Sequence, residues 1–335
     1  MAKSITIKDI AREAGVSIAL VSFVMNNRVG ADGKQKYRVS PTTRDKILEV
    51  ARQMHYQPSS AARMLRKGRT HVVGVILSDL SNLFYGVIAK ELEMILYQHG
   101  YTPLFFSTEE DPERFGRVIQ LASERDVEGF IVVPAAGSAK YVEQLQASET
   151  PFVVIDRYYP PHSVPSVLVD NEDAMRLAVR NLQERGARNI ALVSYAMRIS
   201  SMTDREKSFR EQLGEKAPIY FLGFNSVEED AEKAVDQILA LHIDGVVTAS
   251  NIPGVAIIKA LMRRGIRIQQ DILLTSFDFS NTYSLFNPPI PYIQQPLKQI
   301  AAESAAYLFK LIAMKEQGQD FHAVTDHIVL KARLV

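Results

Sequence analysis

The sequence predicts an all-α amino-terminal head followed by an α/β body of two doubly wound parallel-sheet lobes. Three observations lead to this prediction. Positive charge is concentrated in the first 71 residues, short amphipathic helical patterns occupy that segment, and apolar β-branched runs alternate with helical patterns from Val72 onward. The length of 335 residues also exceeds that of one ordinary domain.

The composition is that of a folded protein from a reducing compartment. Hydrophobic residues make up 47% of the chain, and 17 Gly and 15 Pro are too few for a disordered or fibrous protein. The absence of cysteine excludes disulfide scaffolds, iron–sulfur centres, cysteine–zinc sites and thiol nucleophiles. The amino terminus lacks a secretory signal, and no apolar run reaches the ~18 residues of a membrane span. We therefore expect a cytoplasmic protein with no membrane partner.

The formal net charge of +1 conceals two opposite charges. Residues 1–71 hold 14 Lys and Arg against five Asp and Glu, a net charge of +9. The remaining residues hold 25 Lys and Arg against 33 Asp and Glu, a net charge of −8. A basic head on an acidic body indicates a polyanion partner at one end of the chain only. A solvated basic arm is the alternative, and a folded head would argue against it.

The head begins with two short helical patterns joined by a glycine. Thr6 and Asp9 have the spacing of a capping box, and an apolar stripe follows at helical spacing, formed by Ile7, Ile10, Ala11 and Ala14. Gly15 can take the positive φ that ends a helix, and Ser17 can cap the next one. In that second helix Leu20, Val21 and Val24 face the first helix, whereas the outer side holds Ile18, Ala19, Ser22 and Phe23. Two short helices around a tight turn are typical of a helix-turn-helix, whose second helix reads the major groove of DNA.

A third helix completes a small core. Ser40 and Pro41 form an N-cap followed by proline at the first helical position, and the apolar residues after them are Ile47, Leu48, Ala51 and Met54. A three-helix bundle without a DNA function is the alternative. The basic residues of the intervening loop, residues 27–38, could reach phosphates or could be solvated, and the sequence leaves both open.

A short linker follows the head. Pro58 stops the third helix, and Ser59 or Ser60 can cap a helix that ends near Gly68. With barely two turns and little apolar surface, this helix should be marginal in isolation. We expect it to fold only on its target.

The body reads as a repeated α/β unit. Strands are predicted at residues 73–77, 102–106, 130–133, 152–155, 167–169, 190–193, 219–222, 246–249, 273–277 and 292–294, with helices between most of them, for instance residues 83–99 and 297–315. Continuous apolar strands separated by helices indicate parallel sheets covered on both faces. Ten strands divide better into two sheets, and the proline-rich segments 158–165 and 286–291 are predicted to pass between the lobes.

Two such lobes create a cleft at the carboxyl ends of their strands, where these folds bind ligands. Polar and aromatic residues stand at those ends: Ser78, Asp79, Phe84, Tyr85, Asp156, Arg157 and Asp278, with Ser200, Ser201 and Arg205 at a helix start. Guanidinium and carboxylate groups pair with hydroxyls, and rings can stack on sugar faces, so the pattern favours a polyhydroxylated ligand. A structural salt bridge or a helix cap is the alternative at each position.

Four strings in this order, TIKDIAREAGVS, VSFVMNN, YQPSSAARMLRKGRT and VGVILSDLSNLFYG, resemble the LacI/GalR (lactose/galactose repressor) family of bacterial regulators. The resemblance covers essentially the whole chain. It implies a helix-turn-helix head at residues 1–57, a hinge helix at 58–71 and a periplasmic-binding-protein-like body at 72–335. It also implies a homodimer that binds a pseudo-palindromic operator in double-stranded DNA.

The resemblance assigns DNA contacts to Thr6, Ser17, Ile18, Ala19, Ser22, Phe23, Asn26, Ser59, Ala62, Leu65 and Arg66, with Leu65 as an apolar wedge in the minor groove. The chain departs from the family at Leu20 and Phe23, where Thr and Arg are usual, at Ser59, where Asn is usual, and in its longer loop before Ser40. Phe23 could contact a thymine methyl group or lean on the protein. Because Ile18 and Ala19 are short and apolar, readout here is expected to depend on methyl contacts and DNA deformability.

The resemblance assigns effector contacts to Phe84, Tyr85, Arg157, Ser201, Arg205, Asn225 and Asp278. Asn225 stands at a position that is often aromatic in sugar- and purine-binding relatives. Ser250 and Asn251 replace the usual Asn-Asp pair, which removes one carboxylate. The implied effector is a sugar or sugar derivative, with a nucleobase as the second choice.

An enzyme and a transport protein are the competing classes. The sequence holds no phosphate-binding loop, dinucleotide-binding glycine motif, nucleophile elbow or His-Glu-x-x-His pair, and a lone His322/His327 pair does not suggest a metal. A transport protein would need a signal peptide and no basic head. We therefore expect no catalysis, cofactor or metal, and predict an allosteric transcriptional regulator that represses its target. The alternative is a small-molecule-binding or sugar-processing α/β protein with an accessory basic head.

Overall fold

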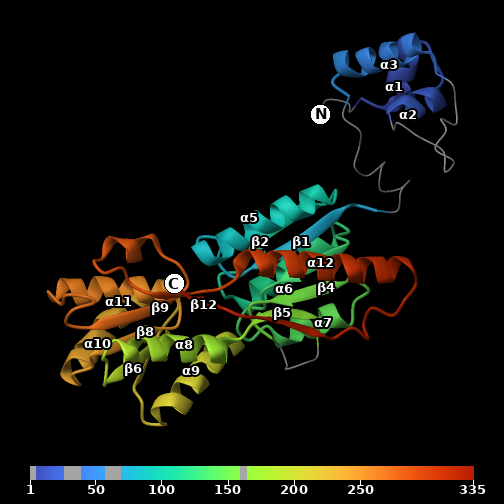
Figure 1. The fold of residues 1–335 in the computed structure, drawn as a ribbon. Coiled ribbons are helices and arrows are strands. Elements are labelled where there is room, and N and C mark those ends of the chain that lie inside the picture. Colours follow the sequence, from blue (N-terminus) through green and yellow to red (C-terminus); the bar gives the residue numbers. More distant parts are fainter. Residues whose placement is uncertain (1–4, 26–38, 57–68, 159–163) are drawn as a thin grey trace. The chain divides into compact units, whose positions relative to one another are not determined.

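The computed structural model describes residues 5–25, 39–56, 69–158 and 164–335. The chain forms two compact units, Met1–Thr70 and His71–Val335 (Figure 1). We call the first unit the head and the second the body.

The described residues of the head form three helices whose ends follow the sequence signals. They are α1 (Ile7–Ala14), α2 (Ile18–Met25) and α3 (Pro41–Gln53). The Asp9 carboxylate accepts hydrogen bonds from the Thr6 backbone N–H at 3.0 Å and the Thr6 hydroxyl at 2.8 Å, and Gly15 ends α1 with φ of 66°. The Ser17 hydroxyl accepts from the Leu20 N–H, and the Ser40 hydroxyl accepts from the Thr43 N–H. The predicted helix starts are therefore confirmed.

The core of the head corrects one prediction for α2. Its buried members are Ile10, Ala11, Ala14, Val21, Phe23, Val24, Ile47 and Ala51. Phe23 is only 8% exposed, whereas Ile18 is 43% exposed. Placing Phe23 on the outer side of α2 was therefore wrong, because a large ring gains more from burial in this small core than from exposure.

The body contains two six-stranded sheets, each in its own lobe. The sheet of the amino-terminal lobe has the order β11-β5-β4-β3-β1-β2 and comprises β1 (Val72–Leu77), β2 (Thr102–Ser107), β3 (Gly129–Val132), β4 (Phe152–Ile155), β5 (Ser166–Val169) and β11 (His327–Leu330). The sheet of the carboxy-terminal lobe has the order β12-β10-β9-β8-β6-β7 and comprises β6 (Ile190–Tyr195), β7 (Ile219–Leu222), β8 (Gly245–Thr248), β9 (Leu273–Phe277), β10 (Tyr292–Gln294) and β12 (Arg333–Leu334). Among the described strands, every pairing is parallel except that of β10 with β12. The sequence prediction missed β11 and β12.

Helices cover both faces of each sheet, as predicted. The helices of the amino-terminal lobe are α5 (Leu83–Gln98), α6 (Pro112–Ser123), α7 (Ala139–Gln146) and α12 (Leu297–Glu316). Those of the carboxy-terminal lobe are α8 (Asn171–Glu184), α9 (Ser200–Leu213), α10 (Val227–Ala240) and α11 (Asn251–Arg263). α5 and α12 pack on one face of the first sheet, and α6 and α7 pack on the other (Figure 1). In the second sheet α8 and α9 cover one face, and α10 and α11 cover the other.

The chain passes between the lobes at three points, none of them in the predicted segments. It leaves the first sheet after β5 at Asp170, returns after β10 at Gln295 and Pro296, and crosses again after β11 at Lys331. Residues 158–165 join β4 to β5 within one sheet, and residues 286–291 lie between a 3-10 helix (Asn281–Leu285) and β10 within the other. The prediction of crossovers there was wrong, because proline marks a turn and does not specify which sheet the next strand joins.

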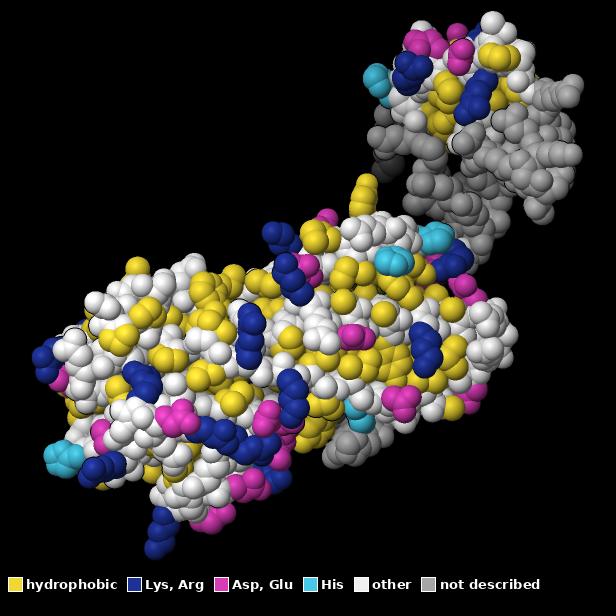
Figure 2. All heavy atoms as spheres, viewed as in Figure 1, with side chains coloured by type: hydrophobic (Ala, Val, Ile, Leu, Met, Phe, Trp, Pro, Cys, Tyr) yellow, Lys and Arg dark blue, Asp and Glu magenta, His cyan; other side chains and the backbone are white. Residues whose placement is uncertain are grey.

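The surface of the body mixes side chains of different kinds. Figure 2 shows hydrophobic side chains among charged ones of both signs on the face in view. Among the described helices, none combines the length and the apolar character needed to cross a bilayer.

Candidate functional site

A cavity of about 320 Å³ lies between the lobes, at the carboxyl ends of their strands. Six of the seven predicted effector contacts line it: Phe84, Tyr85, Arg157, Ser201, Arg205 and Asp278. The seventh, Asn225, is exposed in the loop after β7 and lies outside this lining, whereas its neighbour Phe224 lines the cavity. A contact between Asn225 and the effector stays a prediction.

The aromatic wall of the cavity is set by the start of α5. The Asn82 side chain caps this helix by accepting a hydrogen bond from the Phe84 N–H at 3.0 Å. The Phe84 and Tyr85 rings meet edge to face, with centroids 4.9 Å apart. Asn82 also accepts a hydrogen bond from the Asn251 amide at 3.1 Å, which joins the two lobes across the cleft. Asn251, a departure from the family pattern, therefore serves as an interlobe contact.

Arg205 is held rigidly but keeps donors for a ligand. It lies in α9, is 2% exposed, and stacks on the Phe277 ring with its Cζ atom 4.2 Å from the ring centroid. Its Nε–H donates to Asn171 Oδ1 at 2.8 Å and its Nη1–H donates to the Ala249 carbonyl at 2.6 Å. A guanidinium has five N–H donors, so three of them have no acceptor among the described residues. Burial lowers the pKa of Arg205, and Asp278 acts in the opposite direction.

Asp278 supplies an acceptor in the same lobe. It follows β9 in the left-handed conformation, with φ of 62°, and is 7% exposed. Its Oδ1 accepts a hydrogen bond from the Gln295 amide at 2.7 Å. Burial raises the pKa of Asp278 to about 6, although Arg205 opposes the shift. Between described residues, no hydrogen bond or ion pair joins Asp278 to Arg205, so a ligand hydroxyl group could bind to both.

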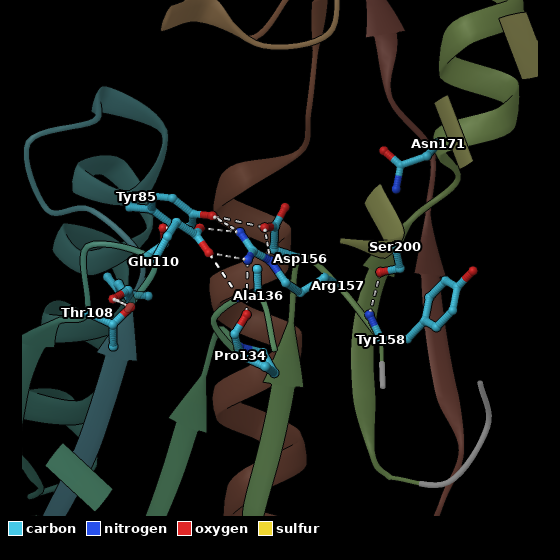
Figure 3. Close-up of polar contacts among 12 residues, drawn as sticks. Tyr85, Thr108, Glu110, Pro134, Ala136, Asp156, Arg157, Tyr158, Asn171 and Ser200 are labelled. Atoms are coloured by element: carbon cyan, nitrogen blue, oxygen red, sulfur yellow. Dashed lines mark hydrogen bonds and ion pairs between the residues drawn. The ribbon is translucent and has the colours of Figure 1, made fainter. Parts of the chain in front are cut away.

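Arg157 lies at the other end of the cavity in a dense polar network (Figure 3). Its Nη1 and Nη2 atoms donate to the two carboxylate oxygens of Glu110 at 3.0 and 2.9 Å. Nη1 also donates to the Pro134 carbonyl, Nη2 to the Tyr85 hydroxyl, and Nε to Asp156 Oδ2. The Arg157 and Glu110 side chains are 5% and 6% exposed. Arg157 therefore borders the cavity as part of a buried ion pair.

Glu110 is the main residue that sequence analysis missed. It accepts further hydrogen bonds from the Ser78 hydroxyl and from the Ala136 N–H at 3.2 Å. Burial alone would raise the pKa of Glu110, but the contacts with Arg157 prevail and hold it below its usual value. The signal that could have found Glu110 is its place just after β2, at the same sheet edge as the other site residues.

The remaining candidates have structural roles in the described part of the chain. Ser200 lies outside the cavity lining, and its hydroxyl accepts a hydrogen bond from the Tyr158 N–H at 2.8 Å. Asp79 lines the cavity and accepts hydrogen bonds from the Ser81 N–H and hydroxyl, so it also stabilises the turn before α5. Among the described residues, no three His, Cys, Asp or Glu side chains are grouped so that they could hold a metal ion.

The predicted DNA contacts lie partly in the described helices of the head and partly outside the described residues. Thr6, Ser17, Ile18 and Ala19 are exposed, Ser22 is half-buried and Phe23 is buried. Of the two roles left open for Phe23, the structure supports packing against the protein. Asn26, Ser59, Ala62, Leu65 and Arg66, and the basic loop 27–38, lie outside the described residues.

Two family models match the chain in consecutive segments. The model of bacterial regulatory proteins of the lacI family matches residues 6–59. The model of periplasmic binding proteins and the sugar binding domain of the LacI family matches residues 70–333. The chain belongs to the LacI family. It is therefore a DNA-binding transcriptional regulator with an effector-binding body.

Whole-chain relatives of this LacI-family protein agree with that assignment. The ribose operon repressor of Halalkalibacterium halodurans is 30% identical over 97% of this chain and 96% of its own length. Catabolite control protein A of Staphylococcus xylosus is 28% identical over 95% of this chain and 94% of its own. The fold is similar to that of the Lac repressor dimer bound to operator, with a TM-score of 0.83, 21% identity and coverage of 99% and 98% of the two chains. A LacI family regulator from Enterococcus faecalis with bound ribose has a TM-score of 0.69 at 22% identity, over 79% and 96% of the chains.

Proposed function

We propose that this protein is a cytoplasmic, homodimeric repressor without catalytic activity, whose interlobe cavity binds a neutral sugar. The observation that carries the proposal is the arrangement of Arg205 and Asp278. Among the described residues, three Arg205 donors have no acceptor, and Arg205 and Asp278 line one cavity without pairing with each other. Hydroxyl groups both donate and accept hydrogen bonds, so a polyhydroxylated ligand matches this pair.

The rest of the cavity supports the same class of ligand. The rings of Phe84, Tyr195 and Phe224 and the side chains of Met197 and Met202 give it apolar walls that suit the carbon faces of a sugar. A volume of about 320 Å³ is at the small end of ligand sites, which favours a monosaccharide. The ribose operon repressor among the relatives, and the relative structure with bound ribose, agree with this size.

The head supports operator binding. The exposed side chains of Ser17, Ile18 and Ala19 lie at the start of α2, the helix that we assign to the major groove. The amino-terminal 71 residues carry a net charge of +9, which attracts phosphates. In the body, Met94 and Tyr97 of α5 are 42% and 77% exposed, and such apolar surface supports a dimer contact.

Control of DNA binding would act through the lobes. A sugar that contacts both lobes favours their closure, and the three crossovers at Asp170, Gln295 and Lys331 would bend as the lobes close. Coupling between two sites of this kind is about 1–3 kcal/mol, a roughly five- to 150-fold change in operator affinity.

A titration of the full chain with an operator duplex, located by selection from random sequence, tests this function. Because the head displaces counterions from several phosphates, the affinity should fall at least about 100-fold between 50 and 200 mM salt. A thermal-shift screen of neutral sugars, with purines as the competing class, should then identify a ligand that raises the melting temperature and changes operator affinity. A protein that selects no duplex over random sequence, with or without these ligands, would contradict the proposal.

A further inference from the structure

The two arginines of the cavity differ in what they can offer a ligand. All five N–H donors of Arg157 have protein acceptors: one on Asp156, one on Pro134, one on Tyr85 and two on Glu110. Arg205 uses only two of its five donors on acceptors of the described chain. Arg157 therefore lines the cavity with a positive charge but has no free hydrogen-bond donor for a ligand.

Glu110 is the residue that makes this difference. It is the only one of these acceptors that binds two guanidinium nitrogens of Arg157, in the forked geometry that is strongest for such pairs. Its own oxygens are fixed by Ser78 and Ala136, so the carboxylate cannot turn away without losing further hydrogen bonds. Figure 3 shows the Arg157 guanidinium between Glu110 and Asp156.

The pair also sets the electrostatic balance of the cavity. The lining holds five carboxylates, of Asp79, Glu109, Glu110, Asp156 and Asp278, against the two guanidiniums of Arg157 and Arg205. With all groups ionised, this part of the lining carries a net charge of −3. This negative charge would repel a ligand that bears a phosphate or carboxylate group. Arg157, the guanidinium in the amino-terminal lobe, has no free donor with which to bind such a group.

We infer that Glu110 determines effector specificity: by occupying Arg157, it excludes phosphorylated and acidic sugars and leaves the cavity to neutral ones. In Glu110→Gln one acceptor oxygen becomes an NH2 group, so at least one Arg157 donor would be freed and the negative charge beside Arg157 would be lost. The cavity would then accept an anionic group at the amino-terminal lobe. This inference rests on the proposed role of the cavity as the effector site.

Inorganic phosphate is the probe, and its affinity for the full-length protein is measured by calorimetry at constant ionic strength. Glu110→Gln should bind phosphate at least tenfold more tightly than the wild type. Glu109→Gln is the matched control, because it removes one carboxylate from the same lining without touching Arg157. It should change phosphate affinity less than threefold. The double variant Glu110→Gln/Arg157→Gln should return to the wild-type affinity.

Glu110→Asp covers the case in which Glu110→Gln does not fold. It keeps the charge but is one methylene shorter, so it cannot hold both Arg157 nitrogens and the Ala136 N–H together, and it should tighten phosphate binding two- to fivefold. Three results would overturn the inference. Every folded Glu110 variant could bind phosphate with wild-type affinity, or Glu110→Gln and Glu109→Gln could gain equally in phosphate affinity. The third is a gain in phosphate affinity that persists in the double variant without Arg157. The phosphate measurement needs neither sugar nor DNA, so its failure is separate from failure of the proposed function. A protein that binds a neutral sugar and its operator but gives any of these results keeps the function and loses the role of Glu110.

Discussion

Each lobe places an aspartate at the same point of its sheet, but the two aspartates have different hydrogen-bond partners. In each sheet the fourth strand along the chain ends in an aspartate with left-handed backbone: Asp156 after β4, with φ of 70°, and Asp278 after β9, with φ of 62°. Asp156 accepts hydrogen bonds from Tyr85 and Arg157, both of which are buried. Asp278 accepts one from the neutral Gln295 amide.

The difference separates two roles within one cavity. In the amino-terminal lobe, the Arg157 guanidinium pairs with the carboxylates of Glu110 and Asp156. The hydrogen-bond donors of Arg157 are therefore all used within the protein. In the carboxy-terminal lobe, Arg205 and Asp278 are held in place by other groups and remain available to a ligand. A repeated backbone geometry therefore positions a side chain, and its neighbours decide whether it binds a ligand or the protein.

The largest expected effect comes from removing the free donors of the carboxy-terminal lobe. Arg205→Ala should weaken effector binding at least about 100-fold, close to 3 kcal/mol, because charged hydrogen bonds and a stacked cation are lost together. Operator affinity without effector should stay within about threefold of the wild type, measured by fluorescence anisotropy. Loss of operator binding as well would mean that Arg205 supports the fold of the body and would remove the distinction between the lobes.

A smaller effect should appear in the pH dependence of effector binding. The pKa of Asp278 is raised to about 6, so its carboxylate loses its charge as the pH falls below that value. A ligand hydroxyl binds the ionised form more strongly, so effector affinity should fall about tenfold between pH 7.5 and pH 5.

Asp278→Asn is the matched variant for this pH profile. It should bind the effector more weakly at pH 7.5 and show a flat profile over the same range, as measured by calorimetry. A profile that stays steep in this variant would place the titrating group elsewhere in the cavity.

The smallest effect concerns the hydrogen-bond network of Tyr85, Asp156 and Arg157 in the amino-terminal lobe. The Tyr85 hydroxyl donates to Asp156 and accepts from Arg157, so Tyr85→Phe should lower the free energy of unfolding by about 1 kcal/mol. Effector affinity should change less than threefold, because the ring remains and the hydroxyl serves the protein. Urea unfolding measures the first quantity and calorimetry the second. A large loss of affinity with unchanged stability would show that Tyr85 contacts the effector directly.

Much of this architecture could be predicted from local signals. The capping box at Thr6, the αL turn at Gly15 and the N-cap at Ser40 each act within three or four residues, and all three formed as expected. Ten of the twelve strands that the structure describes were predicted, because buried parallel strands are continuous apolar runs. The short strands β11 and β12 lack that signal, since the half-buried His327 lies in β11 and the exposed Arg333 lies in β12.

Local patterns along the chain are enough to predict the two-unit plan, the parallel sheets and the edge at which the site lies, because helix caps, strand periods and strand ends are properties of neighbouring residues. The pairing of site residues with one another depends instead on the tertiary fold. Glu110 meets Arg157 across 47 positions and Asn82 meets Asn251 across 169, distances over which no local pattern acts. The burial of Phe23, the place of Phe224 in the cavity lining and the course of the crossovers depend in the same way on packing between segments far apart in the chain.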